Sequence, residues 1–165
     1  LVKMLAPMIC FTAEEIWKYM PHVKEEQVES VMLSNWPEVN EEYNNEELAE
    51  KWNHILELKE LVAKELELAR ANKTIGHSLN AKVTLYANEK EYEFLKENQD
   101  LLTTVFIVSD LHVEQNARKD ENKIGVKVEV AEGEKCERCW KYSTSVGKNS
   151  KYPTLCDKCS EVMGE

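Results

Sequence analysis

The chain contains two Cys-x-x-Cys pairs, Cys136-Glu137-Arg138-Cys139 and, after residues 140–155, Cys156-Asp157-Lys158-Cys159. Pairs at this separation are typical of a tetrahedral four-thiolate zinc site, because each short turn points two sulfur atoms inward. All four positions are cysteine, so no coordination position is left open for water. We therefore predict one structural Zn²⁺ with Cys136, Cys139, Cys156 and Cys159 as its ligands, and no catalytic role for the metal.

Two disulfides are the alternative use of these cysteines. The chain shows no secretory signal pattern, 32% of its residues are charged, and it has one further cysteine, Cys10. Small disulfide-stabilised secreted domains have a different composition. Zinc is therefore the favoured interpretation. Cys10 lies between Ile9 and Phe11 and is expected to be a buried thiol.

The 165 residues carry a formal net charge of −10, from 31 acidic and 21 basic side chains. An acidic protein repels phosphate groups at long range, so the overall charge disfavours nucleic-acid binding. The loop between the cysteine pairs is different, because it contains lysines and no acidic residue. Basic groups can neutralise phosphates, and aromatic rings can stack on unpaired bases. The candidate RNA contacts are Lys141, Lys148 and Lys151, interleaved with Tyr142 and Tyr152.

No apolar run approaches the roughly 20 residues that a bilayer-spanning helix needs, so no membrane partner is expected. The chain opens as Leu1-Val2-Lys3-Met4-Leu5, an amphipathic fragment without an initiating methionine. This opening indicates a piece of a longer polypeptide.

Residues 1–44 are predicted to be the end of a helical bundle. Thr12 has the position of a helix N-cap, and Glu15 three residues later completes a capping box. Phe11 is placed to pack on Ile16 as a hydrophobic staple.

Residues 29–37 have an apolar centre and end at a proline. We expect them to be extended and to lie as a strap across the bundle. Trp17 and Trp36 are expected to pack inside the bundle.

A long helix is predicted over residues 46–73. Asn44, with Glu47 three residues later, is a variant capping box, and Gly76 follows the helix as C-terminal capping favours. Apolar residues recur at steps of three and four, which predicts one continuous buried seam. The seam consists of Trp52, Ile55, Leu58, Val62, Leu66 and Ala69.

The next segments predict a small α/β module with a short sheet. Residues 81–87 and 124–130 alternate between apolar and polar side chains, as strands do. Residues 88–106 are predicted to be helical, in two pieces, and residues 107–113 to be a strand.

The predicted fold class is α+β, in several parts. The parts are a helical-bundle remnant (1–44), the long helix with a connector (45–80), a small α/β junction module (81–131) and a four-cysteine zinc ribbon (132–165).

Three separated stretches resemble the isoleucyl-tRNA synthetases, in the C-terminal portion of the bacterial form. Residues 5–17 are similar to a segment of the anticodon-binding helical domain, and Leu33-Ser34-Asn35-Trp36-Pro37 to a short strap in that family. Cys136-Glu137-Arg138-Cys139-Trp140 is the most discriminating stretch, because a tryptophan directly after the second cysteine resembles the terminal zinc module of the isoleucine enzymes. Residues 69–81 are similar to the same family.

The resemblance implies a cytoplasmic, monomeric parent ligase that joins isoleucine to tRNA(Ile) with ATP and hydrolyses misacylated valine. The motifs of its active site, His-x-Gly-His and Lys-Met-Ser-Lys-Ser, are not found here. Thr74-Ile75-Gly76-His77 is a superficial match only, because it follows a long helix instead of opening a phosphate-facing one. The chain is therefore expected to have no catalytic residue, to hold tRNA, and to contact other domains of the parent.

Two alternatives remain open at this stage. Some DNA-repair glycosylases end in a zinc finger with the same spacing, but they need a helix-two-turn-helix before it, where this chain has predicted strands. A zinc-ribbon module that binds protein and no nucleic acid would fit the net charge of −10. Trp140 is expected to pack over the metal cluster or the α/β module. Lys135, Arg138 and Lys158 are expected to balance the negative charge of the thiolates.

Overall fold

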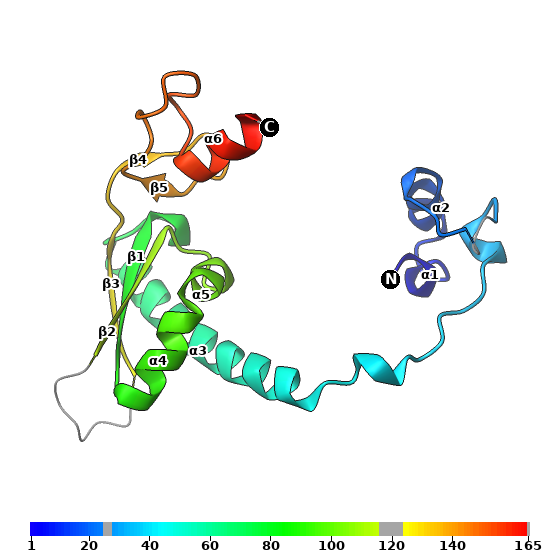
Figure 1. Cartoon of the computed structure of the whole chain (residues 1–165), viewed down its shortest axis with the longest axis horizontal. Helices are drawn as coiled ribbons and strands as arrows, with labels where there is room; N and C mark the ends of the chain where they lie inside the picture. The colour runs from blue at the N-terminus through cyan, green and yellow to red at the C-terminus, as the bar shows by residue number, and fades with distance from the viewer. Residues whose placement is uncertain (25–27, 116–123, 165) are drawn as a thin grey trace. The chain divides into compact units, whose positions relative to one another are not determined.

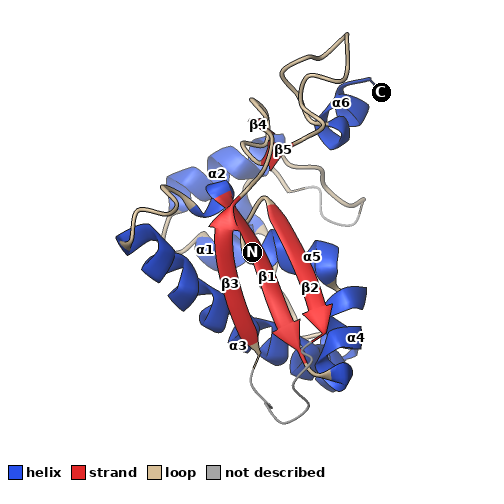
Figure 2. Ribbon diagram, turned by 90° about the vertical axis from the view of Figure 1, so that its left-hand side faces the viewer, coloured by secondary structure: helices blue, strands red, loops and turns tan. Residues whose placement is uncertain are grey.

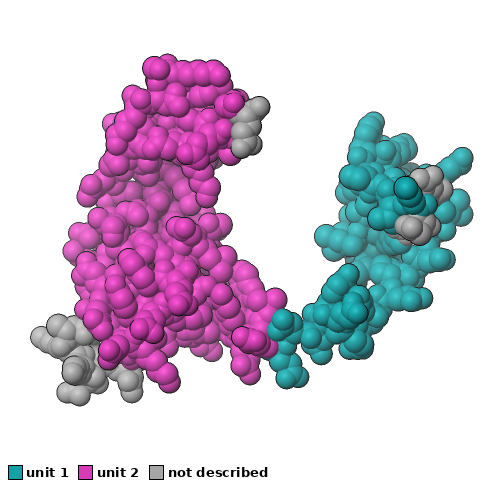
Figure 3. All heavy atoms as spheres, in the orientation of Figure 1, with its two compact units in different colours: residues 1–46 teal, residues 47–165 magenta. Residues whose placement is uncertain are grey.

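The computed structural model describes residues 1–24, 28–115 and 124–164 (Figure 1). They form two compact units, Leu1–Glu46 and Glu47–Glu165 (Figure 3). Helices and strands are mixed in the order that the sequence predicts, which confirms the α+β class with a cysteine-rich terminal part.

The first unit contains α1 (Val2–Leu5), α2 (Cys10–Tyr19) and two single 3-10 turns, η1 (Val31–Leu33) and η2 (Glu41–Tyr43). The expected N-cap at Thr12 is wrong, because α2 begins at Cys10 with Ile9 as its N-cap. The backbone N–H of Ala13 already donates to the Ile9 carbonyl at 2.9 Å, so Thr12 lies inside the first turn. The staple is also wrong, since Phe11 is 89% exposed.

Residues 29–37 do cross the first unit as a strap, but they are not extended throughout. Ser30 caps η1 by accepting a hydrogen bond from the Met32 N–H at 3.1 Å. This turn places Val31 in a small core with Ala6, Ala13 and Trp17.

Two expectations for buried side chains fail in this unit. Trp17 is buried, and its Nε1 donates to the Val28 carbonyl at 2.9 Å. Trp36, however, is 63% exposed, and Cys10 is exposed on the first turn of α2. The physical reason is size: two short helices and a strap bury one face of each element and leave the other faces open.

The long helix is α3 (Glu46–Ala71), and most of its predicted seam is buried. Trp52 is the exception at 39% exposure, because the first turns of α3 extend beyond the sheet (Figure 1). The cap expected at Asn44 is wrong by one position: α3 begins at Glu46, and Asn44 ends η2 instead.

The C-terminal end of α3 is closed by Lys73, not by Gly76. Lys73 has a left-handed backbone with φ 59°. Its N–H donates to the Arg70 carbonyl at 3.0 Å, and the Thr74 N–H donates to the Ala69 carbonyl at 2.9 Å. This pair of bonds is the Schellman arrangement, in which the residue two positions beyond the helix takes the left-handed conformation.

A three-stranded sheet follows, with strand order β2-β1-β3. β1 (Ala81–Ala87) pairs parallel with β2 (Asp110–Gln115) and antiparallel with β3 (Gly125–Val130). Between β1 and β2 the chain forms α4 (Glu89–Glu97) and α5 (Gln99–Val105), which confirms the two helical pieces.

Apolar residues on alternate positions of the strands face the helices. Val83, opposite Leu111 on β2 and Val128 on β3, is fully buried. Figure 2 shows α3, α4 and α5 on one side of the sheet, behind the strands. The other face carries polar side chains such as Lys82 and His112.

The strand expected over residues 107–113 begins late, at Asp110. Ile107 is left-handed with φ 56°, and the Val108 N–H donates back to the Thr103 carbonyl at 3.3 Å. Residues 107–109 therefore close the end of α5 before the strand can start. A single 3-10 turn, η3 (Ser78–Asn80), precedes β1. The last three elements, β4 (Glu134–Lys135), β5 (Tyr142–Ser143) and α6 (Asp157–Gly164), form the cysteine-rich tip.

Candidate metal centre and its surroundings

The zinc knuckle, residues 133–162, presents the four cysteines from two short turns. Cys136 follows β4, and the Trp140 N–H closes the first turn by donating to the Cys136 carbonyl at 2.9 Å. Cys156 immediately precedes α6, and Cys159 lies in the first turn of that helix. The small hairpin of β4 and β5 therefore carries one pair, and the start of α6 carries the other.

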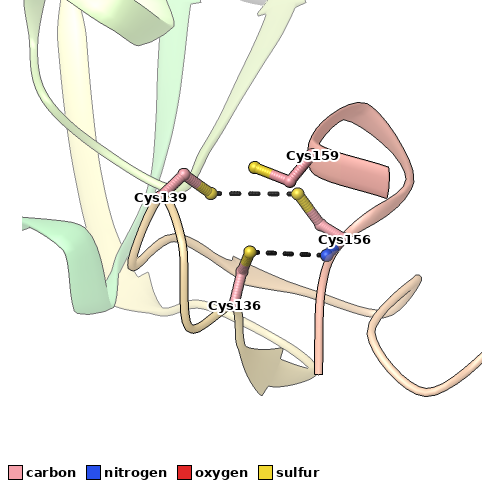
Figure 4. A group of neighbouring side chains, drawn as sticks. All are labelled: Cys136, Cys139, Cys156 and Cys159. Carbon is pink, nitrogen blue, oxygen red and sulfur yellow. Dashed lines mark hydrogen bonds between the residues drawn. The ribbon is translucent and has the colours of Figure 1, made fainter. Parts of the chain in front are cut away.

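The four sulfur atoms point toward one another (Figure 4), and all lie within 4.8 Å of one another. The Cys139 and Cys156 Sγ atoms are 3.8 Å apart. A tetrahedral site with Zn–S bonds of about 2.3 Å requires sulfur atoms about 3.8 Å apart. That separation is much longer than a disulfide bond of about 2.05 Å. The donors thus fit one tetrahedral Zn²⁺, and the predicted ligand set lies in one place.

The thiols differ in their acidity before any metal binds. Burial by itself would raise the pKa of Cys136, but backbone N–H donors, including that of Cys156 at 3.4 Å, together outweigh it. The pKa of Cys136 is therefore lowered, to about 6. Burial, together with neighbouring thiols, raises the pKa of Cys156 to about 12. Burial also raises the pKa of Cys139. A metal with four thiolate ligands must therefore displace protons from this cluster.

One of the three predicted cations contacts a thiol directly. Arg138 Nη1 donates to Cys159 Sγ at 3.7 Å, as expected for a group that balances thiolate charge. Lys135 instead places its Nζ 4.9 Å from the centre of the Trp140 ring. Lys158 lines the cavity described below.

Trp140 does not pack over the cluster or the α/β module as expected. Its side chain is 60% exposed, and its backbone is left-handed with φ 65°. A non-glycine residue rarely adopts this conformation, and a large aromatic one does so least easily. The closed turn after Cys139 imposes it, and the turn thereby directs the indole outward. Sequence reasoning singled out Trp140 by its place directly after the second cysteine, but assigned it to packing instead of to the exposed surface.

The candidate RNA contacts lie on the knuckle but differ in availability. Lys148 and Lys151 are exposed, and Lys141 is half-buried. Lys151 lies over the ring of Tyr152, with Nζ 5.2 Å from its centre. The Tyr152 hydroxyl donates to the Met163 carbonyl at 2.9 Å, which ties the loop to the end of α6.

A cavity of ≈ 740 Å³ lies between the knuckle and the edge of the sheet. Its cationic lining comes from both sides, with Lys82 from β1 and Arg138, Lys141 and Lys158 from the knuckle. Carboxylates, including that of Asp157, also line it. The lining mixes both signs of charge, and its lysines belong to a chain whose net charge is −10.

Comparison with known proteins agrees with this architecture. Residues 1–85 match the family described as the anticodon-binding domain of tRNA ligase. The chain belongs to this family. Residues 133–162 match a zinc finger found in FPG and IleRS, which covers the knuckle.

The chain is also similar to isoleucine–tRNA ligases. The ligase of Caldicellulosiruptor saccharolyticus is 49% identical over 99% of the chain. The ligase of Caldanaerobacter subterraneus subsp. tengcongensis is 44% identical over 100% of it. The chain spans 17% and 18% of the length of these two relatives.

These matches confirm the resemblance to the isoleucyl-tRNA synthetases. The zinc-finger family alone includes both kinds of protein that the cysteine spacing suggested. The match over residues 1–85 and the full-length coverage of the chain by the ligases separate them, and the DNA-glycosylase alternative is not favoured. Within the described parts of the chain, no helix is long and apolar enough to cross a membrane.

Proposed function

We propose that this chain is the tRNA-binding portion of a cytoplasmic, monomeric isoleucine–tRNA ligase, and that it positions tRNA(Ile) for aminoacylation. Activation of isoleucine with ATP belongs to other parts of such a ligase, and this chain contributes no catalytic residue. The four segments 1–44, 45–80, 81–131 and 132–165 serve as bundle end, connecting helix, junction and RNA-contacting tip.

The exposed indole of Trp140 is the observation that carries this proposal. Zinc, when bound by the four cysteines, holds the knuckle rigid, so the ring is presented without a large loss of conformational entropy. An exposed aromatic face can stack on an unpaired base, and such stacking contributes about 1–3 kcal/mol. Lys141 follows it directly and supports contacts to phosphate groups.

The other basic and aromatic residues of the loop are proposed as secondary contacts. Lys148 and Lys151 are exposed, and the loop contains no acidic residue that would repel a phosphate group near them. Tyr142 is half-buried, and Tyr152 is already engaged by Lys151 and Met163, so these rings support the loop as well as the RNA.

Fluorescence anisotropy with a tRNA(Ile) transcript and the zinc-loaded chain tests the proposal. We expect Trp140→Ala to weaken binding about 10- to 100-fold, which corresponds to the loss of one stacked base. Trp140→Phe retains an aromatic face and should retain most of the affinity. Trp52→Ala, which removes another partly exposed indole from α3, serves as the matched control and should bind like the unsubstituted chain.

The salt dependence of binding separates phosphate contacts from stacking. Lys148→Ala should reduce the slope of log K against log salt by about one, whereas Lys96→Ala on α4 should leave it unchanged. If the unsubstituted chain fails to bind tRNA at both low and moderate salt, a zinc ribbon that binds protein becomes the better interpretation.

A further inference from the structure

Ser109, the residue before β2, joins the zinc knuckle to the sheet. Its hydroxyl donates to the Leu79 carbonyl at 2.5 Å and accepts a hydrogen bond from the Tyr142 N–H at 2.7 Å. Its own backbone N–H donates to the Ala81 carbonyl at 3.1 Å. A serine hydroxyl has one donor and two acceptor sites, so both side-chain bonds can form at once.

No apolar core spans this joint within the part of the chain that the structure describes. The core of the α/β module extends from α3 to the three strands, and the knuckle has its own cluster around Cys136, Cys156 and Cys159. The two clusters share no residue. Packing therefore does not set the orientation of the knuckle, and polar contacts must do so.

Gly133, the first residue of the knuckle, makes a close contact with strand β5. Gly133 has φ +88°, and a Cβ added there would lie 2.3 Å from the carbonyl carbon of Ser143. The neighbouring residue of β5, Tyr142, is the one that donates to Ser109. Strand β5 is thus in close contact with Gly133 inside the knuckle and is hydrogen-bonded to Ser109, just before β2, across the joint.

We propose that Ser109 is a positioning residue that fixes the orientation of the zinc knuckle on the α/β module. Its side chain and Tyr142 both line the cavity between the two parts, so rotation about this bond would move Lys141 and Arg138 relative to Lys82. The consequence for RNA binding rests on the proposed function, because Trp140 is presented by the same knuckle. The orientation itself does not depend on that function.

Residual dipolar couplings of the zinc-loaded chain test the orientation directly. In the unsubstituted chain, the couplings of the amides in β1–β3 and in the knuckle should fit one common alignment tensor. In Ser109→Ala they should require two different tensors, while zinc stays at one per chain and the spectrum of α3 is unchanged. Ser109→Thr keeps the hydroxyl and should restore the common tensor.

Thr103→Val is the matched control, because it removes a half-buried hydroxyl that bonds the Gln99 carbonyl at 2.7 Å inside the α/β module. It should leave the common tensor intact. If the two parts of Ser109→Ala share one alignment tensor, as in the unsubstituted chain, the proposal is overturned.

Binding of tRNA gives a separate measurement. Ser109→Ala removes both side-chain hydrogen bonds, of which only the one from Tyr142 crosses the joint. It should weaken tRNA binding about threefold to tenfold, as expected for the loss of that one orienting bond. If the unsubstituted chain does not bind tRNA, the proposed function fails, and the tensor comparison still decides the role of Ser109. If Ser109→Ala shows two tensors but binds RNA normally, the orientation role stands and its consequence for RNA is rejected.

Discussion

At the scale of single residues, the acidities of the cysteines make zinc binding sensitive to pH. Cys156, with a pKa of about 12, is protonated at neutral pH in the metal-free chain, whereas Cys136, with a pKa of about 6, is largely ionised. Protons compete with Zn²⁺ for each thiol that is protonated. The apparent affinity for zinc must therefore rise with pH.

We expect the slope of log K against pH to be steeper below about pH 6 than above it, because Cys136 must then lose its proton as well. Competition with a chelator of known pH dependence, from about pH 5 to about pH 8, measures this slope. A slope that is uniform across this range would show that Cys136 is not the acidic member of the cluster.

At the scale of elements, the end of α3 is held in a conformation that suits glycine better than lysine. Lys73 has φ 59°, and a left-handed residue with a side chain is strained. Lys73→Gly should raise the free energy of unfolding by about 0.5–1 kcal/mol, after allowance for the greater entropy of glycine in the unfolded chain.

Urea unfolding of the zinc-loaded chain, followed by circular dichroism, measures this change. Gly76→Ala is the control, because a Cβ at Gly76 meets only Asn80 Oδ1, at an ordinary 3.7 Å. Gly76→Ala should therefore be neutral or slightly stabilising. Destabilisation by Gly76→Ala together with destabilisation by Lys73→Gly would instead mean that Gly76 closes the helix, as the sequence pattern predicts.

At the scale of the whole molecule, the separate cores imply that the zinc knuckle and the α/β module lose structure independently. A segment of about 30 residues cannot bury enough apolar surface to fold alone, and zinc binding of about 10–16 kcal/mol makes up the difference. Cys156→Ser should therefore release zinc and unfold the knuckle, while α3 and the sheet remain folded.

Zinc analysis and amide hydrogen exchange on Cys156→Ser measure the two parts of this prediction. Cys10→Ser removes an exposed thiol outside the cluster and should change neither zinc content nor exchange. Retention of one zinc per chain in Cys156→Ser would contradict the ligand assignment. Loss of protection in α3 would contradict the independence of the two cores.

Features that depend on residues close together in the chain could be predicted without the structure. The spacing of the cysteines specifies a four-thiolate site, because a Cys-x-x-Cys turn places two sulfur atoms together whatever surrounds it. The helix α3 and the strands β1 and β3 were predicted from local periodicity, and the structure confirms them as elements. The alternation of burial is less regular than predicted, because Thr84 is buried and Val130 is exposed.

Which surfaces stay exposed and how the parts are joined became clear from the folded structure. Trp36 and Trp140 look like core residues in the sequence, yet both are exposed, because none of the elements described in the structure covers their positions. The strand order β2-β1-β3 and the contact of Ser109 with Tyr142 join residues that are far apart in the chain. Burial and such contacts depend on which elements meet, and local periodicity contains no information about partners at that distance.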